Sequence, residues 1–316
     1  MKIVQIPKRS GGTRTICVPS SKLKRQLRLA IPHLQRVARQ ECDPDVVHGF
    51  IELRSPVTNA ARHVGYRYTL SMDLKDFFDC VKKDEYSSRN RRLGTHRHCR
   101  PFCELAQQHG WRLWHNGVAR QGLPTSPILA NIAAAPMDRD ILEWMKARCG
   151  VHSVYTRYAD DLTFSYDEPL YAKDLMEWIP RIAAKHGFTV NAAKTQLQDA
   201  QRGRRIITGV AVDDTGLHPT RAAKRRMRAA LHNAKTGKTK HWPARQWMRH
   251  AQSCRRKGVD VDREAWLRRW LWKRFYGQRE WCALKPPKVG RRSAWRIGEA
   301  FKPAEALAEM SQRRPC

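Results

Sequence analysis

The stretch RYADDLTFS, residues 157–165, carries two adjacent aspartates between runs in which apolar and polar residues alternate. Alternation with a period of two is typical of a strand with one buried face. Residues 151–158 and 161–166 are therefore predicted to form a hairpin, with Asp160 and Asp161 at its tip. The tight turn between the two predicted strands contains no glycine to relieve backbone strain. Strained backbone is tolerated mostly at functional sites.

Two neighbouring carboxylates repel each other, and the repulsion pushes their pKa values apart unless a cation lies between them. A pair of divalent cations such as Mg²⁺ removes that cost and can hold the attacking and leaving oxygens of a phosphoryl transfer. Such ions take oxygen ligands from more than one element. Asp73, near the end of a predicted strand over 66–74, is the candidate third ligand beside Asp160 and Asp161. For an isolated Asp-Asp pair, a solvated turn is the alternative.

Further motifs surround this pair in a fixed order. DLKDFF (73–78) and QGLPTSP (121–127) precede it, and NAAKT (191–195) follows it. In this order the sequence strongly resembles reverse transcriptases, over roughly residues 5–212. The resemblance implies an α+β right-hand polymerase fold. Its fingers and palm would be interleaved in residues 1–214, as an antiparallel sheet with helices on one face, and a mainly helical basic thumb would follow in 215–316.

The resemblance also implies roles for the acidic residues. Asp73 and Asp160 match the metal-binding carboxylates, and Asp161 matches the second aspartate of the hairpin, which supports the same two ions. The expected cofactor is Mg²⁺, with Mn²⁺ as an alternative. Lys194 matches a lysine that can donate a proton to the leaving pyrophosphate. An ordinary surface lysine is the alternative there.

A deoxynucleotide (dNTP) pocket is implied in the same way. Phe78 matches the bulky residue that excludes a 2′-hydroxyl, with a core phenylalanine as the alternative, and Gln121 matches the glutamine that lines the incoming nucleotide. Lys8 and Arg14 match cations that bind the triphosphate. Arg14 suits a phosphate because its guanidinium binds two oxygens at once, whereas Lys8 acts as a point charge.

Two short motifs narrow the subfamily. The sequence NAARH over 59–63 fits the NAxxH pattern of retron reverse transcriptases, through Asn59 and His63. The sequence ITG over 207–209, with Thr208 and Gly209, resembles their VTG signature. Each motif alone also fits ordinary structure, and the resemblance depends on finding both in the expected order. It implies that these residues take part in RNA binding.

Resemblance to retrons implies a particular reaction. The enzyme would use its own structured non-coding RNA as template, and would start from the 2′-hydroxyl of a branching guanosine. The product would be multicopy single-stranded DNA joined to RNA. The implied partners are this RNA, the RNA–DNA hybrid, a host RNase H and an effector protein, in anti-phage defence.

The charge of the chain agrees with a nucleic-acid partner. There are 61 lysines and arginines against 29 acidic residues, a net charge of +32. A folded chain with that charge repels itself unless a polyanion neutralises it. Residues 215–316 hold 27 of these cations against seven acids, and seven of the eleven tryptophans. We therefore predict a domain boundary near 213–220.

One helical face is expected to contact nucleic acid in this basic region. Helical spacing brings four cations together in residues 221–240: Arg221, Lys224, Arg225 and Arg228. The tryptophans that follow could stack on unpaired bases. Core packing is the alternative for them.

No apolar run reaches the roughly 18 residues of a spanning helix, and no signal peptide is recognised, so a cytoplasmic protein with no membrane partner is expected. The nine cysteines form no CxxC pair and are expected to be reduced. The stretch HRHCRPFC could hold zinc through His96, His98, Cys99 and Cys103, but it lacks a second ligand pair at the usual spacing. A partly buried helix start is the alternative.

Apolar spacing and turn residues predict the remaining elements. A hairpin is expected over 6–20, a basic helix over 21–40 that Pro32 bends or interrupts, and a helix over 76–86. Further helices are expected over 126–150, with Ser126 as N-cap and a kink or break at Pro136, and over 173–187. Residues 188–195 and 204–213 are expected to be extended.

Other functions remain open at this point. Another reverse transcriptase, either an abortive-infection or defence enzyme without a retron RNA or a relative of group II intron enzymes, would share the motifs. A catalytically silent RNA-binding scaffold would not need Asp73, Asp160 and Asp161. A metal nuclease would need neither Phe78 nor the QGLPTSP loop.

Overall fold

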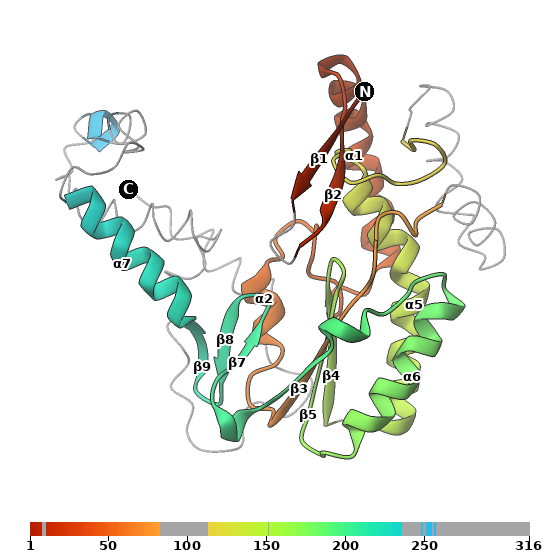
Figure 1. Ribbon diagram of the computed structural model, residues 1–316, viewed down its shortest axis with the longest axis vertical. Coiled ribbons are helices and arrows are strands. Elements are labelled where there is room, and N and C mark those ends of the chain that lie inside the picture. The colour runs from red at the N-terminus through yellow and green to blue at the C-terminus, as the bar shows by residue number, and fades with distance from the viewer. Residues whose placement is uncertain are drawn as a thin grey trace.

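The computed structural model describes residues 1–7, 11–82, 113–150, 152–235, 248, 251–254 and 256. Figure 1 shows the arrangement of the elements. In chain order they are β1 (Lys2–Pro7), β2 (Thr13–Val18), α1 (Ser21–Glu41), α2 (Pro56–Ala61), β3 (Tyr68–Asp73), α5 (Ser126–Arg148), β4 (Ser153–Tyr158), β5 (Asp161–Tyr166), α6 (Tyr171–Lys185), β6 (Gln196–Asp199), β7 (Arg205–Ile207), β8 (Val210–Asp213), β9 (Gly216–Pro219) and α7 (Arg221–Lys235), with 3-10 turns at Ala192–Lys194 and Ala200–Arg202.

A four-stranded antiparallel sheet carries the Asp-Asp hairpin. Its strand order is β4-β5-β3-β6, so β3 is paired with both β5 and β6. The predicted strand over 66–74 and the predicted hairpin around the aspartates are both confirmed. The register places Asp73, the last residue of β3, opposite Asp161, the first residue of β5. The carboxylates that the sequence singles out therefore lie together where β3 ends and β5 begins, a place that we call the carboxylate edge.

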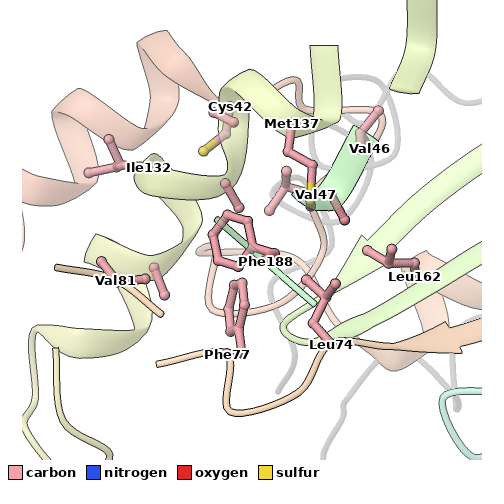
Figure 2. Packing of buried hydrophobic residues seen from close by; sticks show 14 of the residues in the cluster. Cys42, Val46, Val47, Leu74, Phe77, Val81, Ile132, Met137, Leu162 and Phe188 are labelled. Carbon is pink, nitrogen blue, oxygen red and sulfur yellow. The ribbon is translucent and has the colours of Figure 1, made fainter. Parts of the chain in front are cut away.

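One face of this sheet packs on α5 and α6 (Figure 1). Successive side chains of a strand point to opposite faces, and Leu162, Phe164 and Tyr166 of β5 all belong to the main apolar core. Figure 2 shows part of this core. The predicted mixture of helices with antiparallel strands is thus confirmed.

The other face of the sheet is also covered, so the expectation of helices on one face alone is wrong. Figure 1 shows α2 and the small sheet β7-β8-β9 on that side. A second apolar cluster joins α2 to β7 and β8 through Val57, Ala60, Ile207, Val210 and Val212. Polar side chains from the sheet, described below, lie against this layer.

Three helices in the described part of the chain, α1, α5 and α6, contain an internal proline, and each runs through it. α1 continues past Pro32, α5 past Pro136 and α6 past Pro180, so an interruption at Pro32 and a break at Pro136 are wrong, whereas a bend or kink at these two prolines stays a prediction. In α1, buried residues on either side of the proline, such as Ala30 and Leu34, pack in the core. Their burial offsets the backbone hydrogen bond that a proline cannot make. In α5 the N-cap is Thr125, and Ser126 is already helical.

The segment after β3 is not the helix that its apolar spacing predicts. Residues 76–80 form turns, in which the N–H groups of Asp79 and Cys80 both donate to the carbonyl of Asp76. Asp76 has φ 45°, which lies outside the helical region. The rest of the predicted helix, residues 83–86, lies outside the described residues. In 188–195, expected to be extended, the 3-10 turn Ala192–Lys194 interrupts the extended backbone.

The first residues form the predicted hairpin, β1 paired with β2. At the other end, β9 pairs with β8 across the predicted domain boundary, and α7 begins directly after it. The sheet β7-β8-β9 therefore extends to Pro219. The division into residues 1–214 and 215–316 stays a prediction.

Candidate active site

The tip of the hairpin is a tight turn between Tyr158 and Asp161. Ala159 in this turn has φ 59°, a left-handed conformation that is costly for a residue with a Cβ atom. The segment before α2 supports the turn, because the N–H of Arg157 donates to the carbonyl of Val46 and the N–H of His48 donates to the carbonyl of Arg157. A Cβ atom added to Gly49 would lie 2.4 Å from the nitrogen of Ala159. Only a glycine allows this approach.

A buried guanidinium holds the same turn from inside. Arg157 is fully buried, and its Nη1 donates to the carbonyl of Ala159 (3.2 Å) and to Oδ1 of Asn131 (2.9 Å). Its Nε and Nη2 donate to the carboxylate of Asp138, which also accepts from the hydroxyl of Tyr155. Burial alone would lower the pKa of Arg157, but the Asp138 carboxylate reverses this and raises it.

Sequence reasoning missed this buried charge pair. The available signal was an arginine inside the alternating pattern of the strand, together with Asn131 and Asp138 in an otherwise apolar helix. Polar residues of this kind are seldom buried unless they bind one another. They fix the backbone that presents Asp160 and Asp161.

Three carboxylates lie close enough to affect one another: Asp73 at the end of β3, Asp161 at the start of β5 and Asp160 in the turn before it. Asp73 is paired with Asp161, and the N–H of Leu74 donates to the carbonyl of Asp160 (2.9 Å). Although the Asp161 side chain reaches solvent, partial burial by neighbouring atoms, and then the charges of Asp160 and Asp73, raise its pKa to about 6. Burial likewise raises the pKa of Asp160. Burial and the neighbouring carboxylates thus make it costly to hold Asp160 and Asp161 ionised together.

Lys194 supplies a cation beside Asp73. Its Nζ donates to both carboxylate oxygens of Asp73, at 3.0 and 2.9 Å. The hydrogen bond to Asp73 raises the pKa of Lys194, which keeps its proton in place. The N–H of Asn191 donates to the carbonyl of Asp73, and the N–H of Lys75 donates to the carbonyl of Thr189. The segment that carries Lys194 is therefore docked on the end of β3.

The chemistry of the donor set fits a hard divalent cation, since the carboxylates of Asp73 on β3, Asp161 on β5 and Asp160 in the turn before β5 offer oxygen ligands. Within the described residues, no three His, Cys, Asp or Glu side chains are gathered tightly enough to enclose an ion. The ammonium of Lys194 is bonded to Asp73 instead. The second candidate metal site, with His96, His98, Cys99 and Cys103, lies outside the described residues.

The predicted nucleotide-pocket residues come from several elements. Phe78 follows β3 and is partly buried against the core. Gln121 is joined to β2, because its carbonyl accepts from the N–H of Cys17 (2.8 Å). A Cβ atom on Gly122 would lie 2.3 Å from the carbonyl oxygen of Cys17. Arg14 lies on β2, and its charge lowers the pKa of Asp160 against the larger effect of burial. Lys8 lies outside the described residues.

The two short subfamily motifs meet in the interior. Nδ2 of Asn59 donates to Oγ1 of Thr208 (3.4 Å), whose hydroxyl donates to the carbonyl of Pro56 (3.2 Å). His63 lies against the sheet, with Nδ1 at 2.9 Å from Oγ of Ser165 and Nε2 at 2.7 Å from Oγ1 of Thr156.

Asn59 and His63 are fully buried, so neither side chain has a surface to offer to RNA in this structure. That these residues take part in RNA binding stays a prediction, and their burial favours a supporting part over a direct contact. Burial, followed by the charge of Arg205, holds the pKa of His63 well below its ordinary value. Thr208 is half-buried, and Gly209, at the turn between β7 and β8, is exposed.

The predicted cationic face is on α7. Arg221, Lys224, Arg225 and Arg228 are all exposed, whereas Ala223 is buried.

No helix in the described part of the chain is long and apolar enough to span a membrane.

Comparisons with known proteins agree with the geometry. Residues 6–212 match the family described as reverse transcriptase (RNA-dependent DNA polymerase). The retron Mx65 reverse transcriptase of Myxococcus xanthus is 36% identical over 239 residues, which are 72% of this chain and 54% of the relative. The retron Mx162 reverse transcriptase of the same organism is 33% identical over 263 residues, covering 74% of this chain and 52% of the relative. The chain thus spans about half the length of these relatives.

Retron enzymes of Escherichia coli are also similar, including the retron Ec73 reverse transcriptase at 28% identity over 216 residues, 66% of this chain and 67% of the relative. Among solved structures, a telomerase from Candida albicans has a TM-score of 0.47 at 14% identity, covering 73% of this chain and 49% of that chain. A likeness that distant adds nothing to the assignment. The family match spans more than half of the chain and contains the carboxylate edge, so the chain belongs to the reverse transcriptases.

Proposed function

We propose that this protein is an RNA-directed DNA polymerase in which Asp73, Asp160 and Asp161 bind two divalent cations, Mg²⁺ or alternatively Mn²⁺. The pairing of Asp73 with Asp161 across adjacent strands, beside Asp160, is the observation that carries the proposal. When bound, such cations neutralise the carboxylates and stabilise charge on the oxygens of a phosphoryl transfer. Burial, followed by the neighbouring carboxylates, raises the pKa of Asp160 and of Asp161, which supports the proposal because a bound cation would offset the cost of holding both groups ionised.

Lys194 is proposed to hold the proton that the leaving pyrophosphate needs. Its raised pKa keeps the ammonium protonated at neutral pH, and its Nζ is already at the carboxylate edge. A positioned acid of this kind contributes about 10²–10⁴-fold to a rate.

The nucleotide pocket is proposed to select deoxynucleotides. Phe78 would exclude a 2′-hydroxyl, Gln121 would line the incoming nucleotide, and Lys8 and Arg14 would bind its triphosphate. The link between the carbonyl of Gln121 and β2 supports this assignment, since it joins the strand of Arg14 to the loop of Gln121.

The template and primer are proposed to be one structured non-coding RNA, primed from the 2′-hydroxyl of a branching guanosine to give multicopy single-stranded DNA. Similarity to retron reverse transcriptases and the NAARH and ITG motifs support this. Residues 215–316 would act as a basic thumb, with the cations of α7 on the backbone of the RNA–DNA hybrid. Trimming by a host RNase H, an effector partner and a role in phage defence are inferred through the family alone.

The test is to express the protein with its native flanking DNA and to analyse extracted nucleic acid on a denaturing gel. A short DNA species that shifts after both RNase and debranching treatment is expected, and it should vanish in Asp160→Asn. Asp214→Asn is the matched control, because Asp214 is an exposed aspartate on the turn between β8 and β9.

Other outcomes would change the proposal in distinct ways. Polymerase activity on an added primer–template, without the branched DNA, would favour an abortive-infection or group II intron-like enzyme. Unchanged synthesis in Asp160→Asn would contradict the metal-site assignment.

A further inference from the structure

Four phenylalanines form a continuous row from the core to the surface beside the carboxylate edge. The ring centroids of Phe188 and Phe77 are 5.6 Å apart, those of Phe77 and Phe78 are 5.6 Å apart, and those of Phe78 and Phe50 are 6.1 Å apart. Figure 2 shows Phe77 and Phe188 in contact within the core. Phe188 and Phe77 are buried, Phe78 is partly buried, and Phe50 is 41% exposed. Phe78 therefore has a fixed inner neighbour and an outer neighbour at the surface.

Phe50 is held on a strained backbone. It has φ 60°, a conformation that large side chains rarely adopt. Its neighbour Gly49 is fixed on both sides, because the carbonyl of Gly49 accepts from Nδ2 of Asn131 (2.7 Å) and its Cα lies against the turn at Ala159. The same segment pairs with Arg157 through Val46 and His48. The backbone that carries Phe50 is thus anchored to the hairpin that carries the aspartates.

An exposed phenylalanine alone needs no explanation, since single apolar residues are common on protein surfaces. Phe50 differs from such residues in three ways: its backbone is strained, the adjacent residues are anchored to the hairpin, and its ring lies beside the ring of Phe78. A ring held at unfavourable φ, against the predicted 2′-hydroxyl gate, is in the class of strained residues that cluster at functional sites.

We propose that Phe50 is a specificity-determining residue that braces Phe78 from the solvent side and thereby sets how strongly the site rejects ribonucleotides. The proposal rests on the proposed function, in which Phe78 excludes the 2′-hydroxyl. Exclusion by contact depends on a ring that cannot move aside. Phe77 and Phe188 prevent inward movement of Phe78, and Phe50 prevents outward movement.

The test compares incorporation of dGTP and GTP opposite cytosine on a primed RNA template. The measured quantity is the ratio of kcat/KM for dGTP to kcat/KM for GTP. In Phe50→Ala and Phe50→Leu this ratio is expected to fall by about tenfold, the lower end of the effect of a methylene-sized change in a pocket. A purely structural role would lower both values together and leave the ratio unchanged. Thermal unfolding of both variants checks that they fold.

Leu53→Ala is the matched control. Leu53 is on the same loop, also has positive φ (62°), and is more exposed at 67%. The ratio of kcat/KM for dGTP to kcat/KM for GTP in Leu53→Ala should equal that of the wild type. Phe78→Val is the reference variant, and its ratio should fall further than that of Phe50→Ala. In the double variant Phe50→Ala, Phe78→Val, the ratio should be the same as in Phe78→Val alone, because Phe50 acts on the ratio only through Phe78.

The outcomes separate the two ideas. An unchanged ratio in Phe50→Ala with a reduced ratio in Phe78→Val overturns the brace and leaves the proposed function intact. An unchanged ratio in Phe78→Val overturns both the gate and the brace. Equal losses in Phe50→Ala and Leu53→Ala also overturn the brace, since they would reflect the loop as a whole.

Discussion

The ammonium of Lys194 lies 3.0 Å from one carboxylate oxygen of Asp73 and 2.9 Å from the other, where a metal ion bound by Asp73 would lie. Lys194 is half exposed, whereas Asp73 is mostly buried. The lysine thus neutralises the carboxylate that the proposed metal site requires. Binding of a divalent cation to Asp73 would have to compete with this ion pair.

Replacing Lys194 with methionine is therefore expected to tighten the binding of Mn²⁺, while lowering the rate of DNA synthesis. A partly exposed ion pair contributes up to about 1 kcal/mol, which corresponds to about fivefold in affinity. Calorimetric titration of Mn²⁺ into the free protein measures this. Lys185→Met is the control, since Lys185 pairs with Asp140 on another part of the surface. Weaker binding in Lys194→Met would contradict the competition.

The Arg157–Asp138 pair provides a second prediction. Both side chains are almost fully buried, so Arg157→Met leaves the carboxylate of Asp138 without its partner. Breaking a buried pair in this way typically costs about 3–5 kcal/mol in the free energy of unfolding. The double change Arg157→Met, Asp138→Leu should cost less than Arg157→Met alone. Urea unfolding measures both, and a larger loss in the double variant would show that the pair is not the source of the effect.

Sequence reasoning reached the parts of this molecule that depend on local pattern. The period-two alternation around Asp160 predicts the hairpin, and the order of the motifs predicts that Asp73 lies near it. Spacing alone could not predict the turns over 76–80, because the apolar residues there suit a helix, whereas Asp76 adopts φ 45° in the structure. The roles of the site residues stay predictions.

Contacts between distant segments were beyond the sequence. The segment Val46–Gly49 pairs with Arg157 more than one hundred residues away, and no local signal specifies that contact. The burial of Asn59 and His63 is likewise a product of tertiary packing against β4 and β5. Two motifs that resemble an RNA-binding signature therefore form an internal junction, which only the structure could reveal.

His63 predicts how stability depends on pH. Its pKa is held well below the ordinary value in the folded state, so the unfolded chain takes up a proton below about pH 6.5 that the folded chain does not. The free energy of unfolding therefore decreases as the pH falls below that value, by up to about 1.4 kcal/mol per pH unit. His48, with a pKa lowered to about 3, adds a similar loss.

The measurement is the urea midpoint of wild type and His63→Gln between pH 4.5 and 7.5. His63→Gln removes one titrating group. The urea midpoint of this variant should therefore fall less steeply as the pH is lowered, whatever the midpoint at pH 7.5. His48→Gln is the comparison, because it should reduce the slope by a similar amount through a different contact. An unchanged slope in His63→Gln would mean that His63 is protonated in the folded protein.

The cations of α7 give the last prediction. If Arg221, Lys224, Arg225 and Arg228 contact phosphates, each contact releases counterions and adds about 0.7–0.9 to the slope of log Kd against log salt concentration. Replacing Arg221 and Arg225 with glutamine should therefore weaken binding of an RNA–DNA hybrid and reduce that slope by about 1.4–1.8. Arg181→Gln serves as the control, because Arg181 is exposed on α6 and already lies over the ring of Trp178. Equal slopes for wild type and the α7 variant would assign the hybrid to another surface, whereas a loss of affinity with an unchanged slope would point to a contact with bases rather than phosphates.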